Sequence, residues 1–251
     1  WIRQLRHPDR VVLDSAAIAA QNRKLERLDA SIHDLRGMSA TLTPAQAVGW
    51  IGGLSARPEV PLFDVDGKPV ASSVLDALID NAALPTIPET APTRYGLVVE
   101  RADLRTFPTS MRVFEERGDT DIDQFQESAL YPGSPVAIVH ESSDKLWWFV
   151  VSPRYAAWIE KRHIAEGSAA QVFGYVDKQP SVIVTGATAR TVNTREQPSV
   201  SELQLDMGVR VPVLADWPAD QPINGQHPYT SHAIELPMRG ADGRLQFTPA
   251  L

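Results

Sequence analysis

A proline-rich segment divides this chain into two regions with different apolar spacing. Residues 85–93 read Pro-Thr-Ile-Pro-Glu-Thr-Ala-Pro-Thr and hold three prolines. Proline fixes φ and removes a backbone donor, so this segment predicts an extended linker rather than a regular element. We therefore place a domain boundary here and expect a first domain over residues 1–91.

The region before the boundary has the residue pattern of helices. Residues 15–28 follow Asp14 and are rich in helix-forming residues. Ile18, Leu25 and Leu28 recur at helical spacing, which predicts one buried apolar stripe along this helix.

Two shorter helices are predicted further along the same region. Thr43-Pro44 supplies an N-cap followed by proline at the first helical position, and the helix it opens runs to Leu54. A third helix is predicted over residues 72–81, where apolar residues again recur at helical spacing.

Short apolar runs typical of strands begin at Tyr95. They cover residues 97–99, 135–140 and 146–151 and are separated by turn residues. A long polar loop, about residues 106–126, interrupts them, and long loops within a compact domain are usually functional or mobile. In an SH3-type barrel this is the position of the hairpin arm called the RT loop. Residues 92–166 are expected to form a first β unit.

The last part of the chain, residues 167–251, has the pattern of a second small β unit. Its predicted strands cover residues 181–185, 209–214, 232–236 and 244–247. Residues 238–244 predict a hairpin turn with Asp-Gly at its tip. The expected fold class is therefore α+β, mostly β, with a small N-terminal helical domain followed by two small β units.

The distribution of charge argues against two classes of partner. The chain has 24 Lys and Arg, 31 Asp and Glu, and a net charge of −7. No third of the chain has more basic than acidic residues. Nucleic-acid binding needs clustered Lys and Arg, and so does attraction to an anionic membrane surface. No apolar run approaches the ~18 residues of a membrane span.

The absence of cysteine removes several chemistries at once. It excludes a disulfide, a thiolate nucleophile, an iron–sulfur cluster and a cysteine-ligated zinc from this chain. The phosphate-binding motif Gly-x-x-x-x-Gly-Lys-Ser/Thr is also absent, so no cofactor is predicted. The chain begins at Trp1 rather than at methionine, and we expect that an upstream piece such as an export signal was removed.

Four ordered stretches of the middle region resemble the first bacterial SH3 (SH3b) domain of the NlpC/P60 cell-wall endopeptidases. They are Arg-Ala-Asp-Leu-Arg-Thr-Phe-Pro-Thr at 101–109, Ala-Leu-Tyr-Pro-Gly-Ser-Pro-Val at 129–136, Trp-Trp at 147–148 and Tyr-Ala-Ala-Trp-Ile at 155–159. The nine residues 101–109 are the most specific of these. The front segment is similar to the family's N-terminal helical domain, and the tail resembles its second SH3b domain more distantly. The resemblance therefore implies a small N-terminal helical domain followed by two SH3-like β-barrels, over residues 92–166 and 167–251.

The resemblance implies γ-D-glutamyl-L-diamino-acid endopeptidase activity on peptidoglycan stem peptides. In that family a papain-like domain with a cysteine nucleophile follows the SH3b domains. Because this chain has no cysteine, we expect no catalytic residue in it. It is expected to be the non-catalytic region that frames the substrate and targets the cell wall, exported to the periplasm or cell envelope. Its expected partners are a stem peptide and an NlpC/P60 catalytic domain, in cis or as a separate piece.

Two alternatives to this expectation remain open. One is a stand-alone SH3b protein that binds peptides or peptidoglycan with no hydrolase partner. The other is an enzyme, in which case this chain is a fragment of a cysteine peptidase and the activity belongs to the full polypeptide.

Three aromatic residues are candidate substrate-binding residues. The resemblance assigns Tyr131 to the wall of the active-site cleft, and the alternative interpretation is a core tyrosine at a strand edge. Trp147 and Trp148 are adjacent on a predicted strand, so one is expected to be buried and the other outward. Trp148 and Tyr155 are thus candidates for stacking on a ligand, and the alternative is that they fill the barrel.

The predicted loop supplies two candidate carboxylates, Asp119 and Asp121, to pair with the free amine of a stem peptide. Their spacing also suggests a calcium loop, but the required glycine and bidentate glutamate are missing. The remaining interpretation is a solvated loop. The six histidines are scattered, and no two have the i,i+4 spacing of a helical zinc site, so no metal is predicted.

Overall fold

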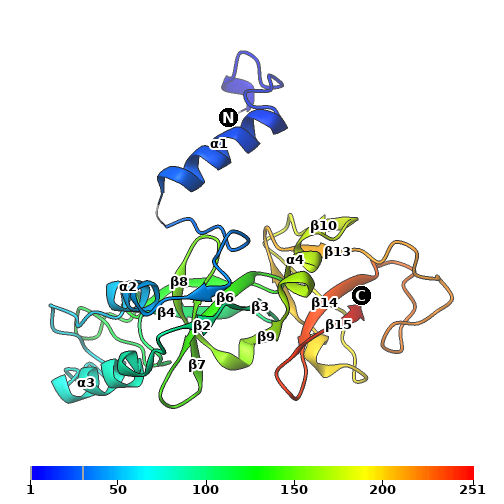
Figure 1. Cartoon of the computed structure of the whole chain (residues 1–251). Helices are drawn as coiled ribbons and strands as arrows, with labels where there is room; N and C mark the ends of the chain where they lie inside the picture. The colour runs from blue at the N-terminus through cyan, green and yellow to red at the C-terminus, as the bar shows by residue number, and fades with distance from the viewer. Residues whose placement is uncertain (1, 30) are drawn as a thin grey trace.

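The computed structural model describes residues 2–29 and 31–251 and confirms the predicted α+β fold class. A helical front precedes a large antiparallel sheet and then a second, smaller β unit (Figure 1). Within the described ranges, none of the helices has the length and apolar character of a membrane-spanning segment.

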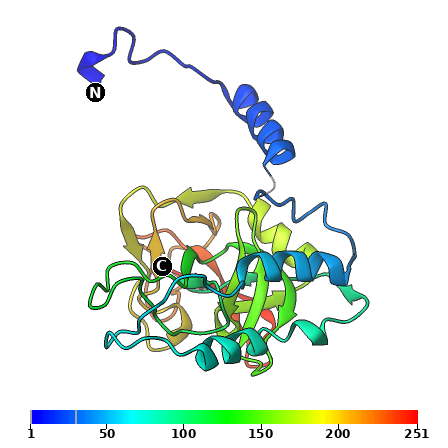
Figure 2. The same ribbon diagram turned by 90° about the vertical axis from the view of Figure 1, so that its left-hand side faces the viewer.

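The N-terminal arm stands away from the rest of the molecule in both ribbon views (Figures 1 and 2). It contains a short 3-10 helix, η1 (Ile2–Gln4), and the helix α1 (Ser15–Leu28). The Asp14 carboxylate accepts a hydrogen bond from the Ala17 backbone N–H at 2.7 Å and so caps α1, as expected at an N-cap.

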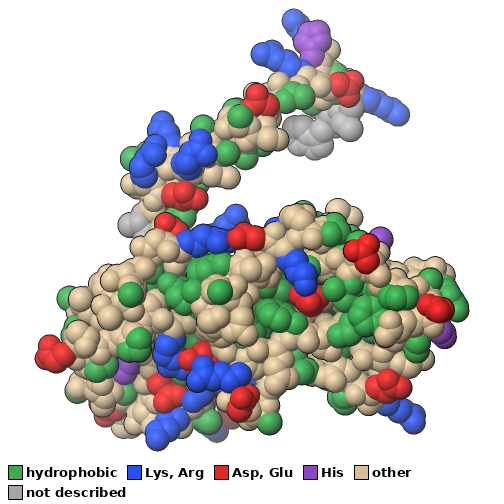
Figure 3. All heavy atoms as spheres, turned by 45° about the vertical axis from the view of Figure 1, so that its right-hand side comes forward, with side chains coloured by type: hydrophobic (Ala, Val, Ile, Leu, Met, Phe, Trp, Pro, Cys, Tyr) green, Lys and Arg blue, Asp and Glu red, His purple; other side chains and the backbone are tan. Residues whose placement is uncertain are grey.

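The predicted buried stripe on α1 is wrong. Ile18 and Leu25 are 46% and 48% exposed, and Leu28 is 73% exposed. Helix formers and a capped N-terminus specify the helix locally, but among the described residues none of its side chains is buried against the body (Figure 3). The predicted helix is present, and its apolar side chains remain in solvent.

The helix α2 (Pro44–Leu54) packs directly on the first β unit. A capping box joins Thr43 and Gln46, with Pro44 at the first position, as the sequence predicts. Ile51 is fully buried against Trp158 and Phe149 of the sheet. At its end, the Trp158 indole N–H donates to the Ser55 hydroxyl at 3.0 Å.

The third predicted helix is α3 (Ser72–Asn81), and it packs against the long loop. Its Leu75 lies in one apolar cluster with Phe107 and Phe125. The proline-rich segment after it holds a 3-10 turn, η2 (Leu84–Thr86), and the short strand β2 (Ala91–Pro92). Strand β2 pairs antiparallel with β1 (Thr41–Leu42), so the linker is tied to the helical region.

The first β unit is one antiparallel sheet with the order β5-β4-β8-β7-β6-β3-β9. The three strands predicted in this region are confirmed as β3, β6 and β7, and four more are present. The bounds are β3 (Arg94–Val98), β4 (Ala102–Arg105), β5 (Gln126–Leu130), β6 (Pro135–Glu141), β7 (Trp147–Val151), β8 (Ala156–Glu160) and β9 (Ile164–Gly167), with a 3-10 turn η3 (Lys161–His163) before β9.

The long loop predicted between strands is confirmed. Residues 106–125 connect β4 to β5 and contain no regular helix or strand. The loop still has its own apolar contacts, because the Phe107 and Phe125 rings meet edge-to-face with centroids 5.0 Å apart. This loop is therefore folded onto the molecule.

The second β unit consists of three antiparallel strand pairs around one apolar cluster, which includes Leu205, Val211 and Leu236. The four predicted strands are present as β10, β13, β14 and β15, and the predicted Asp-Gly turn joins the last two. The bounds are β10 (Ser181–Ile183), β11 (Thr188–Arg190), β12 (Gln204–Asp206), β13 (Arg210–Pro212), β14 (Ile234–Arg239) and β15 (Leu245–Ala250), with a 3-10 turn η4 (Pro198–Val200).

A helix that the sequence analysis did not predict, α4 (Ala169–Asp177), joins the two β units. Ser168 and Gln171 form a capping box at its start. Its Val172 and Tyr175 pack with Leu97 and Leu245, which belong to the two different units. The domain boundaries expected from the sequence stay predictions.

Replacement of Ile51 by alanine tests whether α2 and the first β unit fold together. Removal of this fully buried side chain is expected to lower the free energy of unfolding by about 2–5 kcal/mol. The control is Val48→Ala on the same helix, where the side chain is 45% exposed and the change stays within about 0.5 kcal/mol. Chemical denaturation measures the free energy of unfolding of both variants. Equally small losses in the two variants contradict the packing of α2 on the first β unit.

Candidate functional site

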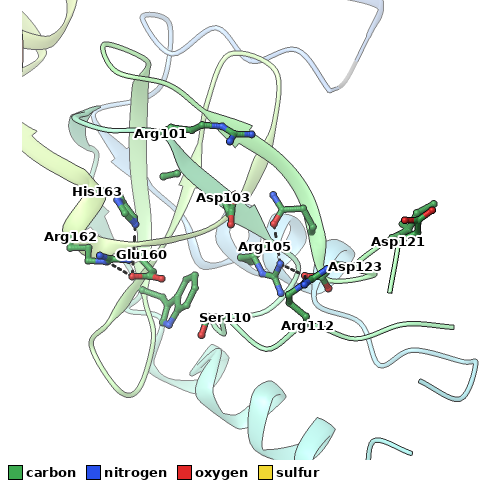
Figure 4. Close-up of a pocket in the computed structure, with 14 residues that line it drawn as sticks. Arg101, Asp103, Arg105, Ser110, Arg112, Asp121, Asp123, Glu160, Arg162 and His163 are labelled. Atoms are coloured by element: carbon green, nitrogen blue, oxygen red, sulfur yellow. Dashed lines mark hydrogen bonds and ion pairs between the residues drawn. The ribbon is translucent and has the colours of Figure 1, made fainter. Parts of the chain in front are cut away.

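A cleft of about 670 Å³ lies on the first β unit, between β4, the 106–125 loop and the end of β8. Figure 4 shows its charged side chains. They come from three separate segments of the chain and include Arg101, Asp103, Arg105, Arg112, Asp121 and Glu160. The cleft is thus lined by both signs of charge.

Arg105 forms the floor of the cleft at the point where the long loop begins. Only 4% of its side chain is exposed, and its Nη1 donates to the Asp123 carboxylate at 2.6 Å and to the Gln126 side chain at 3.0 Å. Its Nε donates to the Thr109 carbonyl at 3.1 Å, and its Nη2 donates to the Met111 carbonyl. Both ends of the loop are therefore fixed to one guanidinium.

The Asp123 carboxylate completes this arrangement. Its second oxygen accepts backbone N–H bonds from Val113 at 3.2 Å and Phe125 at 3.0 Å. A buried charge is tolerated only when it is paired and hydrogen-bonded, and both groups meet that condition here. The ion pair holds the loop in one conformation, and the positive charge of Arg105 and the negative charge of Asp123 cancel each other.

A second charged cluster lies at the other side of the cleft (Figure 4). His163 Nδ1 is 2.9 Å from a Glu100 oxygen, and its Nε2 is 3.8 Å from Glu160. The Arg162 Nε donates to Glu160 at 2.5 Å. The hydrogen bond from His163 lowers the pKa of the Glu100 carboxyl and so keeps it ionised.

The charges that face solvent in the cleft are those of its rim. Arg112 is half-exposed and donates to the Thr120 carbonyl at 3.2 Å, while Arg101 and Asp103 are exposed on β4 and the residue before it. Opposite charges on one rim suit a ligand that carries both an ammonium and a carboxylate. Within the described part of the chain, no three histidine or acidic side chains group as metal ligands.

The structure separates the two acidic candidates of the loop. Asp121 lines the cleft, whereas Asp119 does not, and both side chains are exposed. The Asp119 carboxylate accepts the Asp121 backbone N–H at 3.0 Å, which is a local turn contact.

The prediction that one of Trp147 and Trp148 points outward is wrong. The two residues are 6% and 3% exposed. Helix α2 covers the face that holds Trp147, and three cations, among them Arg94 and Lys161, cover Trp148 at ring-centroid distances of 5.0–5.8 Å. The strand alternates as expected, but both of its faces are buried, so Trp148 has no free face for a ligand.

Tyr155 lies half-buried beside a carboxylate that the sequence analysis did not identify. Its hydroxyl donates to one oxygen of Glu127, and the Thr106 hydroxyl donates to the other at 2.6 Å. The bond to Glu127 and partial burial raise the pKa of Tyr155 to about 12. Two hydroxyl groups therefore hold the Glu127 carboxylate in a fixed orientation.

Tyr131 lies on a different surface from the cleft. It packs against the apolar cluster of the second β unit, beside Val182 and Val209, and lines a separate hollow between the two units. The candidate residues expected from the sequence thus occupy different places, and Asp121 is the one that lines the cleft of Figure 4.

Residues 112–160 match the family described as SH3 domain (SH3b1 type). The whole chain is also similar in fold to the solved structure of an NlpC/P60 endopeptidase from Photobacterium damselae subsp. piscicida, with a TM-score of 0.70 and 16% sequence identity. That likeness covers 100% of this chain and 55% of the other, so the chain spans about half the length of that endopeptidase. No curated protein matches the sequence.

The matched segment and the fold together define the class of the protein as SH3b-containing. The segment lies inside the first β unit and includes most of the long loop and strands β5 to β8. Over its full length the chain shares the fold of the matching part of that endopeptidase structure, in agreement with the fold that the sequence resemblance implies.

Replacement of Arg105 by methionine tests the role of the buried ion pair. It leaves the Asp123 carboxylate buried without its partner, which is expected to cost about 3–5 kcal/mol of stability. The control is Arg112→Gln, because Arg112 is exposed and lies 3.9 Å from the same carboxylate, and exposed pairs contribute about 0–1 kcal/mol. Urea denaturation compares the two variants, and equal losses contradict the assignment.

The Tyr155–Glu127 bond predicts a pH dependence at high pH. The pKa of Tyr155 is raised above its unfolded value, so the stabilising effect is complete below about pH 10 and is lost as pH rises toward about 12. Absorbance of tyrosinate, taken as the difference between the wild type and Tyr155→Phe, measures this ionisation. Glu127→Gln is expected to lower the pKa, and an unchanged midpoint contradicts the bond.

Proposed function

We propose that this chain is the non-catalytic, substrate-framing and cell-wall-targeting region of a peptidoglycan γ-D-glutamyl-L-diamino-acid endopeptidase. One combined observation supports the proposal: the full chain is similar in fold to about half of an NlpC/P60 endopeptidase, and it has no cysteine. Hydrolysis by the expected mechanism needs a thiolate, which this chain cannot supply. A catalytic domain, in cis or as a separate piece, provides it at the cell envelope.

The charge pattern of the first β unit supports a stem peptide as the ligand. Such a peptide carries a free ammonium group at one end and carboxylates along its length. In the described residues, Arg101 in the cleft has no ion-pair partner and can pair with a carboxylate, and Asp103 and Asp121 can pair with ammonium groups. Arg112, which lies 3.9 Å from Asp123, adds positive charge to the rim. Below the rim, the charges of Arg105 and Asp123 cancel each other. The charged side chains of the rim are therefore the ones that can bind the ligand.

Glu127 lies on β5 next to β4, outside the lining of the cleft, and it is the carboxylate best prepared to receive the ammonium group of a peptide that extends past the cleft. Both of its oxygens already accept hydroxyl hydrogen bonds, from Tyr155 and Thr106, so little side-chain entropy is lost on binding. Asp119 is exposed and makes only a local turn contact in the loop, so it lacks this advantage. In this proposal Tyr155 positions Glu127 and does not stack on the ligand.

Binding of the tripeptide L-Ala-γ-D-Glu-diaminopimelate tests the assignment of Glu127. Glu127→Gln is expected to weaken binding about tenfold, which corresponds to one hydrogen bond to a charged group. N-acetylation of the peptide is expected to weaken binding to the wild type by a similar factor, because it removes the ammonium group. Isothermal titration calorimetry measures both effects.

The matched control for this test is Glu115→Gln. Glu115 is an exposed carboxylate of the 106–125 loop, which precedes the strand that holds Glu127, and its side chain has no hydrogen bond in the described residues. Its replacement is expected to leave the affinity unchanged. Equal binding of the free and acetylated peptides contradicts the role of Glu127, and cleavage of the tripeptide by the chain alone contradicts the non-catalytic function.

A further inference from the structure

The hollow beside Tyr131 is a second formed cavity, and it lies between the two β units. Its volume is about 370 Å³, within the range of pockets that hold small ligands. The turn at residues 131–135 forms one side, and the end of α4 with strands β10 and β13 forms the other. Its apolar walls come from Pro132, Pro212 and Val209.

The charge of this hollow is opposite to that of the chain as a whole. The net charge of the protein is −7, yet the hollow is lined by Arg154, Lys178 and Arg210 and by no Asp or Glu. Lys178 is paired with Glu235 at 2.7 Å. Within residues 2–29 and 31–251, neither arginine lies within ion-pair distance of a carboxylate, so two cations face the hollow without neutralisation.

The two arginines differ in how they are held. Arg210 is oriented, because its Nε donates to the Ser181 hydroxyl at 2.7 Å and its Nη1 donates to the Val176 carbonyl at 3.0 Å. The Arg154 side chain is exposed at the turn between β7 and β8 and has no hydrogen bond in the described residues. A fixed arginine and a free one that line the same hollow suit a ligand with a planar anionic group.

The floor of the hollow is rigid. Tyr175 stacks on Phe247 with centroids 5.4 Å apart, and its hydroxyl donates to the Glu235 carbonyl at 3.1 Å. Gly133 has a φ of +84° and approaches Tyr175 so closely that a Cβ atom there would lie 3.0 Å from the ring. The turn therefore requires glycine, and the hollow is formed before any ligand enters.

We propose that this hollow binds the free carboxylate end of a short peptide. Arg210 and Arg154 pair with the carboxylate, and the proline and valine walls receive the small apolar side chain beside it. The two free cations match one or two negative charges, and the apolar walls favour a peptide over inorganic phosphate. This inference goes beyond the proposed function, because it applies to a peptide carboxylate whichever protein the chain assists.

The test uses the full chain with N-acetyl-alanyl-alanine and with its C-terminal amide. The acid is expected to shift the backbone amide signals of Gly133 and Gly208 in NMR titrations, and the amide is expected to bind about tenfold more weakly. Inorganic phosphate is titrated in a parallel experiment. Equal binding of acid and amide overturns the proposal, as does phosphate binding as tight as that of the acid.

Substitutions assign the effect to the hollow. Arg154→Gln is expected to weaken binding of the acid about tenfold without loss of fold, because this side chain makes no contact that stabilises the protein. Arg154→Lys keeps the charge and is expected to restore part of the affinity. Arg195→Gln is the matched control, since Arg195 is exposed and does not line the hollow.

A second variant, Arg210→Gln, is measured together with its thermal unfolding, because Arg210 also bonds to the protein. Unchanged affinity in Arg154→Gln and in a folded Arg210→Gln overturns the proposal, as do shifts confined to the 106–125 loop. The acetylated probe has no ammonium group, so Glu127→Gln is expected to bind it like the wild type. Loss of binding in the arginine variants concerns the hollow, and loss of binding in Glu127→Gln concerns the proposed function, so each can fail without the other.

Discussion

The buried ion pair of Arg105 and Asp123 is the interaction on which the arrangement of the first β unit depends. It fixes a twenty-residue loop with no regular secondary structure through five further hydrogen bonds. Burial of such a pair carries a desolvation free energy, so the pair is tolerated only when its remaining polar atoms are hydrogen-bonded. With the loop fixed, Phe107 and Phe125 form an apolar surface on which Leu75 of α3 packs. Helices α2 and α3, the loop and the sheet are thus parts of one packed body.

The same arrangement divides the polar surface of the protein into separate sites. The cleft above Arg105 has both signs of charge, the Glu127 carboxylate is held by two hydroxyl groups, and the hollow between the β units has two free arginines. A stem peptide carries an ammonium group and several carboxylates, so these sites match different parts of one molecule. In the proposed function, this chain recognises the peptide, and a catalytic domain supplies the nucleophile that hydrolysis needs.

The sequence was sufficient where local patterns decide the structure. Proline at the first position of α2, the Asp-Gly turn between β14 and β15 and the long loop are all set by nearby residues. It was insufficient where tertiary contacts decide. Alternation correctly placed Trp147 and Trp148 on opposite faces, but only α2 and the cations around the sheet show that both faces are covered. The buried Arg105 lay within the most specific stretch, yet its partner is 18 residues away.

The central claim is that this chain recognises peptidoglycan but does not cut it. The most direct measurement incubates the purified chain with intact sacculi, then follows co-sedimentation of the protein and chromatographic analysis of the soluble peptides. The account predicts that the protein sediments with the sacculi and that no γ-D-glutamyl-diamino-acid bond is cleaved. A chain that stays in the supernatant, or one that releases L-Ala-D-Glu, contradicts it.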